Sequence, residues 1–301
     1  MQSDFPKSLL EFQRSFATEE ACWKYLVQSR WPNGFVCPHD GKSSVGFITT
    51  RKLWQCPNGH QISATIGTTL HGTKIPLTKW FWAAYLVITH TPGLSAWQLH
   101  RQLNLNYETA YLMLKRLRAG MVHPSRSPLN GPVEIADFSI GGKKAVPSDR
   151  GTEGKAMIVG AVEIRKEGPC RIRLQKIPQV SSEELIRFIR KHIAPRATII
   201  TDSCRGYSSL RSLGYRHIVK KEETTKEAAK QLPHISRIFA DLKTWLIGTH
   251  HGVSPKQLQT YLDEFSFRFN ERRSPMEAFQ TALRINPKVT QTAALETVHE
   301  T

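Results

Sequence analysis

Apolar residues recur along the chain with two different periods, and each period predicts a different kind of element. Near the start, Leu9, Phe12 and Phe16 follow the three- and four-residue spacing of a helix, and Thr18 opens a second helical segment. The next stretch, 30–73, loses this spacing and is rich in Gly, Pro, Cys and His, with short strand-like runs near its middle. The pattern predicts N-terminal helices followed by a small irregular subdomain.

The middle and the end of the chain differ again. Helical spacing returns over 76–119, and a connector rich in Pro, Ser and Arg follows at 123–132. After the connector we expect strands at 133–135, 156–164 and 170–176, a helix at 181–193, a buried strand at 197–201 and several further helices. Strands followed by an α/β alternation favour a mixed sheet flanked by helices, so α/β is the expected fold class.

Composition adds a partner class and a compartment. The chain has 42 Lys and Arg residues against 25 Asp and Glu, a formal net charge of +17. Such a surface favours a polyanion such as nucleic acid, although a merely soluble basic protein would share it. No run of 18 apolar residues and no secretion-type N-terminus is present, and five scattered cysteines fit a reducing environment. We expect a cytoplasmic, nucleoid-associated protein with no membrane partner.

A pair of short helices around a polar turn is the candidate DNA-binding element. Ser95 can cap the first helix, 104–106 supplies the turn, and Tyr107 opens the second helix. The positions expected to be buried are Leu99, Leu103, Ala110, Leu114 and Leu117. The candidate DNA-binding residues are Tyr107, Lys115, Arg116 and Arg118. A helix-turn-helix places base-reading residues at the start of its second helix and cations around it, but a plain helical hairpin with a solvated basic face fits the same pattern.

Two incomplete cysteine knuckles are the candidate zinc site. Zinc ribbons use two CxxC knuckles that present four thiolates to a tetrahedral ion. Here Cys37 begins one knuckle, with Asp40 in the place of its second cysteine, and Cys56 begins the other, with His60 nearby. A Cys/Cys/His/Asp zinc site is chemically possible. The alternative is a ribbon-like subdomain that keeps its shape without metal.

A carboxylate at the end of a buried strand is the candidate phosphoryl-transfer residue. Asp202 directly follows the apolar strand 197–201, and a partner is expected from the acidic stretch 133–143. Two-metal phosphoryl transfer needs acidic ligands from separate elements that converge on a pair of divalent ions. The alternative role for Asp202 is a turn residue or a helix N-cap.

These segments, in this order, resemble the zinc-ribbon insertion-sequence transposases with an ISXO-type, RNase H-like DDE domain. The resemblance covers about residues 8 to 285. The motifs that carry it are Arg30-Trp-Pro-Asn-Gly-Phe-Val-Cys-Pro, Pro76-Leu-Thr-Lys-Trp-Phe-Trp, Val133-Glu-Ile with Ile140-Gly-Gly-Lys, Thr201-Asp with Tyr207, Gly214-Tyr-Arg-His, and the long runs 242–254 and 261–270. The resemblance implies DNA transposition with Mg²⁺ or Mn²⁺, acting on terminal inverted repeats of double-stranded DNA, and a homo-oligomer that holds two element ends.

The resemblance also fixes the expected domains. In chain order they are N-terminal helices at 1–29, a degenerate zinc-ribbon-like subdomain at 30–75, a helix-turn-helix region at 76–122, a linker at 123–132, an RNase H-like DDE domain at 133–285 and a tail at 286–301.

Two of the three metal-ligand positions that the resemblance implies are substituted. The family's first-strand Asp is replaced by Ala136, with Asp137 one place further on. The second ligand matches Asp202. The third lies seven residues before a functional lysine, and counting back from the matching Lys243 gives Ser236.

Neighbouring residues do not replace the missing ligands easily. Asp137 would face the other side of the sheet unless the strand ends or bulges there, and Glu134 faces the correct side but lies about 6–7 Å along the strand. On the helix, His234 and Asp241 lie roughly on the side opposite Ser236, and a serine hydroxyl is a poor ligand for a hard cation. The candidate catalytic set consists of Asp202 and Lys243, which match the family, and of Asp137 and Glu134, the carboxylates nearest to Ala136. Asp202 is the candidate magnesium ligand.

Three hypotheses follow from this pattern. The first is a fully active transposase with a shifted ligand set. The second is a DNA-binding protein with impaired strand cleavage, including a recruited regulator. The third is a decaying gene product. The first and second differ in a measurable property, namely metal-dependent cleavage of DNA ends.

Overall fold

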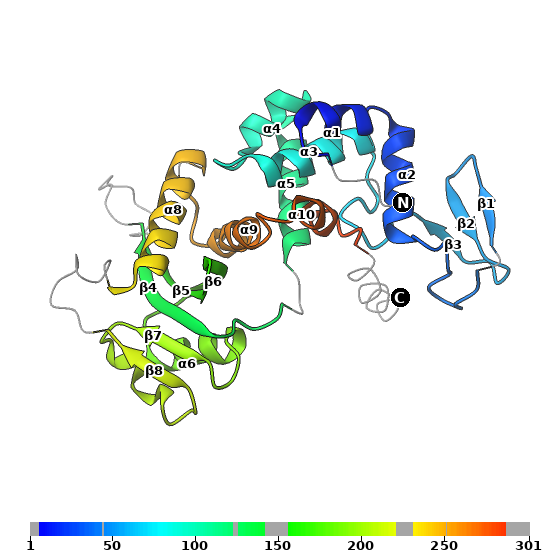
Figure 1. The fold of residues 1–301 in the computed structure, drawn as a ribbon. Coiled ribbons are helices and arrows are strands. Elements are labelled where there is room, and N and C mark those ends of the chain that lie inside the picture. The colour runs from blue at the N-terminus through cyan, green and yellow to red at the C-terminus, as the bar shows by residue number, and fades with distance from the viewer. Residues whose placement is uncertain are drawn as a thin grey trace. The chain divides into compact units, whose positions relative to one another are not determined.

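The fold is available as a computed structural model, which describes residues 6–43, 45–122, 126–141, 156–220, 231–250 and 252–286 (Figure 1). Its contacts divide the chain into two compact units, residues 1–122 with 271–301, and residues 123–270. Within the described residues, no helix is both long and apolar enough to cross a bilayer.

The first unit combines helices with a small sheet. Its helices are α1 (Leu9–Ser15), α2 (Glu19–Arg30), α3 (Leu77–Thr89), α4 (Ala96–Leu103), α5 (Tyr107–Met121) and α10 (Pro275–Ala282), and its strands are β1 (Gly46–Ile48), β2 (Leu53–Gln55) and β3 (Gln61–Ser63). The side chains of Ser8 and Thr18 accept N–H groups of the first turns of α1 and α2, which explains where these helices begin. The expected N-terminal helices and strand-like runs are confirmed.

Aromatic rings hold the helical core of this unit together. Phe12 stacks on Tyr85 at 4.1 Å between ring centroids, and Phe16 meets Phe81 edge-on at 5.1 Å. Phe279 of α10 contacts the same cluster, 5.3 Å from Phe81. Because such rings bury large apolar areas, this cluster fixes α10 to the N-terminal helices.

The expected end of the DDE domain at 285 therefore differs from the structure. The chain from residue 271 onwards belongs to the first unit, and the N–H and hydroxyl of Thr69 donate to the carbonyls of Leu283 and Ala282. The sequence pattern of α10 alone does not reveal this, since an apolar helix face does not specify which core receives it.

The second unit is built on a five-stranded mixed sheet. Its strands are β4 (Pro132–Ile140), β5 (Ala156–Arg165), β6 (Gly168–Ile177), β7 (Thr198–Thr201) and β8 (Arg216–Val219), and its helices are α6 (Ser182–His192), the 3-10 helix η1 (Arg205–Leu210), α8 (Pro233–His250) and α9 (Leu258–Asn270). The strand order is β6-β5-β4-β7-β8. The β4–β5 and β5–β6 pairs are antiparallel, whereas β4–β7 and β7–β8 are parallel. This confirms the α/β fold class.

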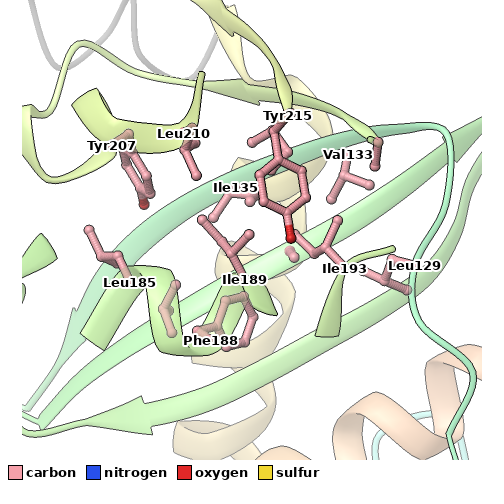
Figure 2. Close-up of a cluster of buried hydrophobic side chains, with 14 of the residues drawn as sticks. Leu129, Val133, Ile135, Leu185, Phe188, Ile189, Ile193, Tyr207, Leu210 and Tyr215 are labelled. Atoms are coloured by element: carbon pink, nitrogen blue, oxygen red, sulfur yellow. The ribbon is translucent and has the colours of Figure 1, made fainter. Parts of the chain in front are cut away.

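Each face of the sheet has its own hydrophobic core. On one face α6 and η1 bring Leu185, Phe188 and Tyr207 against Val133 and Ile135, as Figure 2 shows. On the other face, α8 covers alternate residues of β4, including Ala136 and Phe138, while α9 packs on β6. Successive residues of β4 thus face different helices, and this alternation decides where each candidate catalytic side chain lies.

The stretch expected as a linker is largely part of the second unit. Its residues 123–125 lie outside the described residues. Leu129 is fully buried and exchanges backbone hydrogen bonds of 2.8 Å with His192 and Ala194. Arg171 donates to the carbonyl of Pro128, and Arg126 lies 3.6 Å from the carboxylate of Asp263. Residues 126–131 therefore form an ordered entry to the sheet.

Candidate functional site

The four candidate zinc ligands converge in the ribbon. One ligand atom from each of Cys37, Asp40, Cys56 and His60 lies within 4.8 Å of all the others. The Nδ1 atom of His60 is central: it lies 3.2 Å from the Sγ of Cys56 and 3.8 Å from both the Sγ of Cys37 and the Oδ2 of Asp40. Two thiols, an imidazole and a carboxylate form a donor set that fits Zn²⁺.

Two glycine turns bring these ligands together. Gly41 and Gly59 have φ angles of +68° and +84°, and their N–H groups donate to the carbonyls of Cys37 and Cys56. Glycine, which lacks a Cβ, adopts this left-handed region more readily than any other residue, so each knuckle folds back on its cysteine. An additional contact joins the knuckles, because Asn58 donates to Asp40 at 3.0 Å.

Two of the ribbon ligands differ in the form that they take without a cation. Burial raises the pKa of the Cys37 thiol, so without a cation this group stays protonated at neutral pH. The N–H of Lys42 donates to Asp40 and, together with the neighbouring thiols, holds the pKa of that carboxyl below its usual value. A bound divalent ion would stabilise the thiolate form of the cysteines.

The α4–α5 pair has the expected helix boundaries. Ser95 and Gln98 form a reciprocal capping box at the start of α4, and Asn106 caps α5 through the N–H of Glu108. Asn104 ends α4 in the left-handed region, at φ 46°. Of the positions expected to be buried, Leu99, Ala110, Leu114 and Leu117 are fully or almost fully buried, whereas Leu103 is half-buried.

The basic residues of α5 only partly match the prediction. Lys115 and Arg116 are exposed, although Arg116 donates to the carbonyl of His71. The prediction that Arg118 is exposed is wrong, since this residue is buried, with only 4% of its surface exposed. Arg118 follows Leu114 by one helical turn and directly follows Leu117, so it lies on the side of α5 that the core covers. Tyr107 remains exposed at the first position of α5.

On the sheet, Glu134 has a structural partner that the sequence did not reveal. Its carboxylate is buried and accepts the N–H groups of His234 and Ile235, at 3.0 and 2.9 Å. These groups belong to the first turn of α8, where a helix has unsatisfied donors and favours a negative charge. Glu134 thus anchors the N-terminus of α8 to β4.

The substituted ligand position lies next along the same face. Ala136 lies between Glu134 and Phe138, and the Phe138 ring stacks on Phe239 of α8 at 5.0 Å. The half-buried Ser236 belongs to the turn of α8 between these two contacts. Ala136 therefore presents a methyl group to the first turns of α8.

Asp202 and Asp137 lie close enough to interact. Asp202 comes directly after β7, which pairs in parallel with β4, and its Oδ1 accepts the N–H of Cys204 at 3.1 Å. Asp202 therefore also serves the turn into η1. Asp137 lies on the α6 side of β4, and burial followed by the charge of Asp202 raises its pKa.

Tyr207 adds a buried phenol to this side of the sheet. Its side chain is fully buried on η1, facing Leu185 of α6 (Figure 2), and among the described residues its hydroxyl has no hydrogen-bond partner. Burial, and then the charges of Asp137 and Asp202, raise its pKa well above the usual value. Lys243, by contrast, is exposed on α8.

Comparisons with known proteins agree with this architecture. The ISXO2-like transposase domain matches residues 128–270, and the transposase zinc-ribbon domain matches residues 17–58. Over 292 residues the chain is 26% identical to an uncharacterized protein in transposable element ISH50 of Halobacterium salinarum, which covers 90% of this chain and 97% of that protein.

The solved structures that match are more distant. A Mos1 transposase paired-end complex with the left transposon end is 13% identical, with 72% of this chain and 78% of that chain covered and a TM-score of 0.29. A chain of the simian T-cell lymphotropic virus intasome, solved in complex with the PP2A regulatory subunit B56 gamma, is also 13% identical. The match covers 56% of this chain and 67% of that chain, with a TM-score of 0.31.

Both matched models describe transposase domains, and the chain carries them in the order ribbon, then mixed sheet. The chain belongs to the transposases that combine a zinc-ribbon domain with an ISXO2-like DDE domain.

Proposed function

We propose that this chain binds double-stranded DNA at the terminal inverted repeats of an insertion element and that its metal-dependent strand cleavage is impaired. The observation that carries the proposal is the α8-facing side of β4. There Glu134 is bonded to the first turn of α8, and Ala136 offers no ligand atom. Of the three ligand positions that the family resemblance implies, Asp202 alone keeps its carboxylate.

The residues present do not fit a pair of catalytic ions. Mg²⁺ and Mn²⁺ favour oxygen ligands, and two ions bridged at a phosphate need carboxylates from several elements. Asp202, whose carboxylate also accepts an N–H of the following turn, and Ser236 on α8 do not supply them. Each 1.36 kcal/mol lost from charge stabilisation costs about tenfold in rate, so losing ligands worth several kcal/mol lowers cleavage by orders of magnitude.

The test compares cleavage of DNA ends by the natural chain and by an Ala136→Asp, Ser236→His double variant, with Mg²⁺ and with Mn²⁺. We expect only the double variant to cleave, while both proteins bind the same duplex equally. Equal binding shows that a difference in cleavage is chemical. Cleavage by the natural chain at the level of the variant would overturn the impaired-cleavage proposal.

One observation favours a second candidate, an active transposase with a shifted ligand set. Burial, and then the charge of Asp202, raise the pKa of Asp137, so a cation bound by both carboxylates would relieve their repulsion. Under this alternative, Asp137→Asn abolishes any cleavage by the natural chain, whereas Lys243→Ala lowers it less. If neither change has an effect, this candidate fails.

For the ribbon we propose a structural zinc ion held by Cys37, Asp40, Cys56 and His60. Its support is the convergence of the four ligand atoms. Purified protein should contain about one zinc per chain, and Cys56→Ser should lose it while Cys170→Ser keeps it. Equal zinc content in the two variants would instead favour the metal-free ribbon.

We further propose that the chain is a homo-oligomer on DNA, since two element ends must be held together for transposition. A recruited DNA-binding regulator would need no such pairing. Light scattering of the protein with one and with two end duplexes separates these roles. A complex that never contains more than one duplex would favour the regulator.

A further inference from the structure

An aromatic pair projects from the start of both helices of the α4–α5 pair. Trp97 lies in the first turn of α4 and is 63% exposed, and Tyr107, the first residue of α5, is 43% exposed. Their ring centroids are 5.4 Å apart, and the His100 ring lies 5.3 Å from Trp97. Single exposed apolar residues need no explanation, but a contiguous cluster of rings marks an interaction surface.

Hydrogen bonds of α4 and of the following turn order the backbone that carries the pair. Ser95 and Gln98 fix the first turn of α4 through their reciprocal hydrogen bonds. His100 contacts the carbonyl of Leu105 through its Nδ1 and accepts the Leu105 N–H at its own carbonyl, which ties the end of α4 to the turn. Rings that are already ordered lose little conformational freedom when a partner binds.

The chemistry around the pair fits DNA. Arg101 lies one turn after Trp97 on α4, and Lys115 lies two turns after Tyr107 on α5, and both are exposed. The nearby Lys79 donates to the Asn104 carbonyl at 3.2 Å. Glu108 is the one exposed carboxylate between 95 and 118. In helix-turn-helix docking, the second helix enters the major groove with its first residues while the preceding helix crosses the sugar–phosphate backbone.

We propose that Trp97 is a DNA-contact residue, which packs its indole on the sugar–phosphate backbone while Tyr107 faces the base edges beside it. The inference rests on the proposed DNA binding and adds to it an aromatic residue of α4, beside the basic residues of α5. The indole offers an apolar face and one N–H donor, and the phenol offers an apolar edge to thymine methyl groups. Because neither ring is charged, the pair adds affinity without adding ion release.

The test measures fluorescence anisotropy of labelled duplexes with the full-length protein. The probes are a duplex carrying the sequence at the gene's flank and a mixed-sequence duplex of equal length. Trp97→Ala should weaken binding to the flank duplex roughly 10- to 30-fold, the loss typical of an aromatic anchor. Trp97→Phe should recover part of this loss. The slope of log K against log salt should stay unchanged in both, whereas Lys115→Ala should lower its magnitude by about one.

Leu10→Ala is the matched control. Leu10 is equally exposed, at 63%, and lies on α1 of the same unit. This variant should bind both duplexes like the natural chain, and Trp97→Ala should unfold at the same temperature as Leu10→Ala. Natural affinity in Trp97→Ala overturns the inference but leaves the proposed function standing, provided that Lys115→Ala weakens binding. If the natural chain binds neither duplex, both the proposed function and the inference fail.

Discussion

At the scale of single residues, two of the candidate catalytic side chains, Glu134 and Asp202, have structural roles. Glu134 illustrates this, because the same carboxylate that alternation places on the ligand face is bonded to two N–H groups of α8. A buried carboxylate that satisfies two helix donors is costly to remove. Its retention in the sequence therefore does not by itself indicate catalysis.

This role makes a prediction about stability. Glu134→Ala should lower the free energy of unfolding by about 1–3 kcal/mol, since two buried N–H groups lose their acceptor. Glu134→Gln keeps one acceptor oxygen and should lose less. Urea unfolding followed by circular dichroism measures both variants. Equal stability of Glu134→Ala and the natural chain would show that water satisfies these donors.

His192 predicts how stability depends on pH. Burial, and then the charges of Lys191, Arg173 and Arg126, lower the pKa of His192 to about 4, and its Nε2 lies 3.1 Å from the Oε1 of Gln175. In the unfolded chain this pKa is about 6.5. The folded state therefore binds fewer protons than the unfolded state between these values, so stability is complete above pH 6.5 and falls as the pH drops towards 4.

The measurement is the melting temperature between pH 7 and pH 4 for the natural chain and for His192→Gln. As the pH falls through this window, the natural chain should lose on the order of 1 kcal/mol of stability that the variant keeps. This value allows for the solvent that still reaches the ring. His234→Gln serves as the control, because His234 contacts Glu134 only through its backbone. Parallel curves for the natural chain and His192→Gln would contradict the prediction.

At the scale of elements, features that depend on the local sequence pattern were predicted correctly, whereas features that depend on tertiary packing were not. The caps at Ser95 and Asn106, the turn between α4 and α5, and the strand before Asp202 all carry local signals, and each lies where expected. Arg118 and the end of the DDE domain were not predictable in this way. The end of the DDE domain depends on α10, which returns from the end of the chain to pack on α5, and the burial of Arg118 depends on the core that receives α5.

The candidate sites show the same division. Convergence of the ribbon ligands could be expected from two knuckles with glycine turns, because each knuckle is a local structure. The contact of Glu134 with α8 joins residues a hundred positions apart, and no periodicity reports it. Tyr207 was noticed only within a motif, since a buried tyrosine has the pattern of any core aromatic residue.

The return of α10 can be tested with a pair of glycines. In Gly120→Ala, the new methyl group would meet the Ala282 carbonyl and lie 2.9 Å from the Oγ1 of Thr69, so we expect a loss of about 1–3 kcal/mol through overpacking. Gly248 lies inside α8 with no atom near its Cβ position, so Gly248→Ala should gain about 0.5–1 kcal/mol from helix propensity. Chemical denaturation measures both, and a stabilised Gly120→Ala would show that α10 does not pack as described.

At the scale of the whole molecule, the net charge of +17 and the proposed aromatic contact affect different terms of DNA affinity. Cations that neutralise phosphates release counterions, so this part of the affinity falls steeply with salt, by about 10³- to 10⁵-fold between 50 and 200 mM for six to ten contacts. Contacts made by uncharged rings do not follow this dependence.

We therefore expect the affinities for flank and mixed-sequence duplexes to fall in parallel as salt rises. Their ratio should stay nearly constant, because sequence is read by contacts to base edges rather than by phosphate neutralisation. Anisotropy titrations at four salt concentrations measure both slopes. A ratio that collapses towards one at high salt would mean that discrimination itself depends on charge. In that case the basic residues of α5, rather than the rings at the start of α4 and α5, would distinguish one DNA sequence from another.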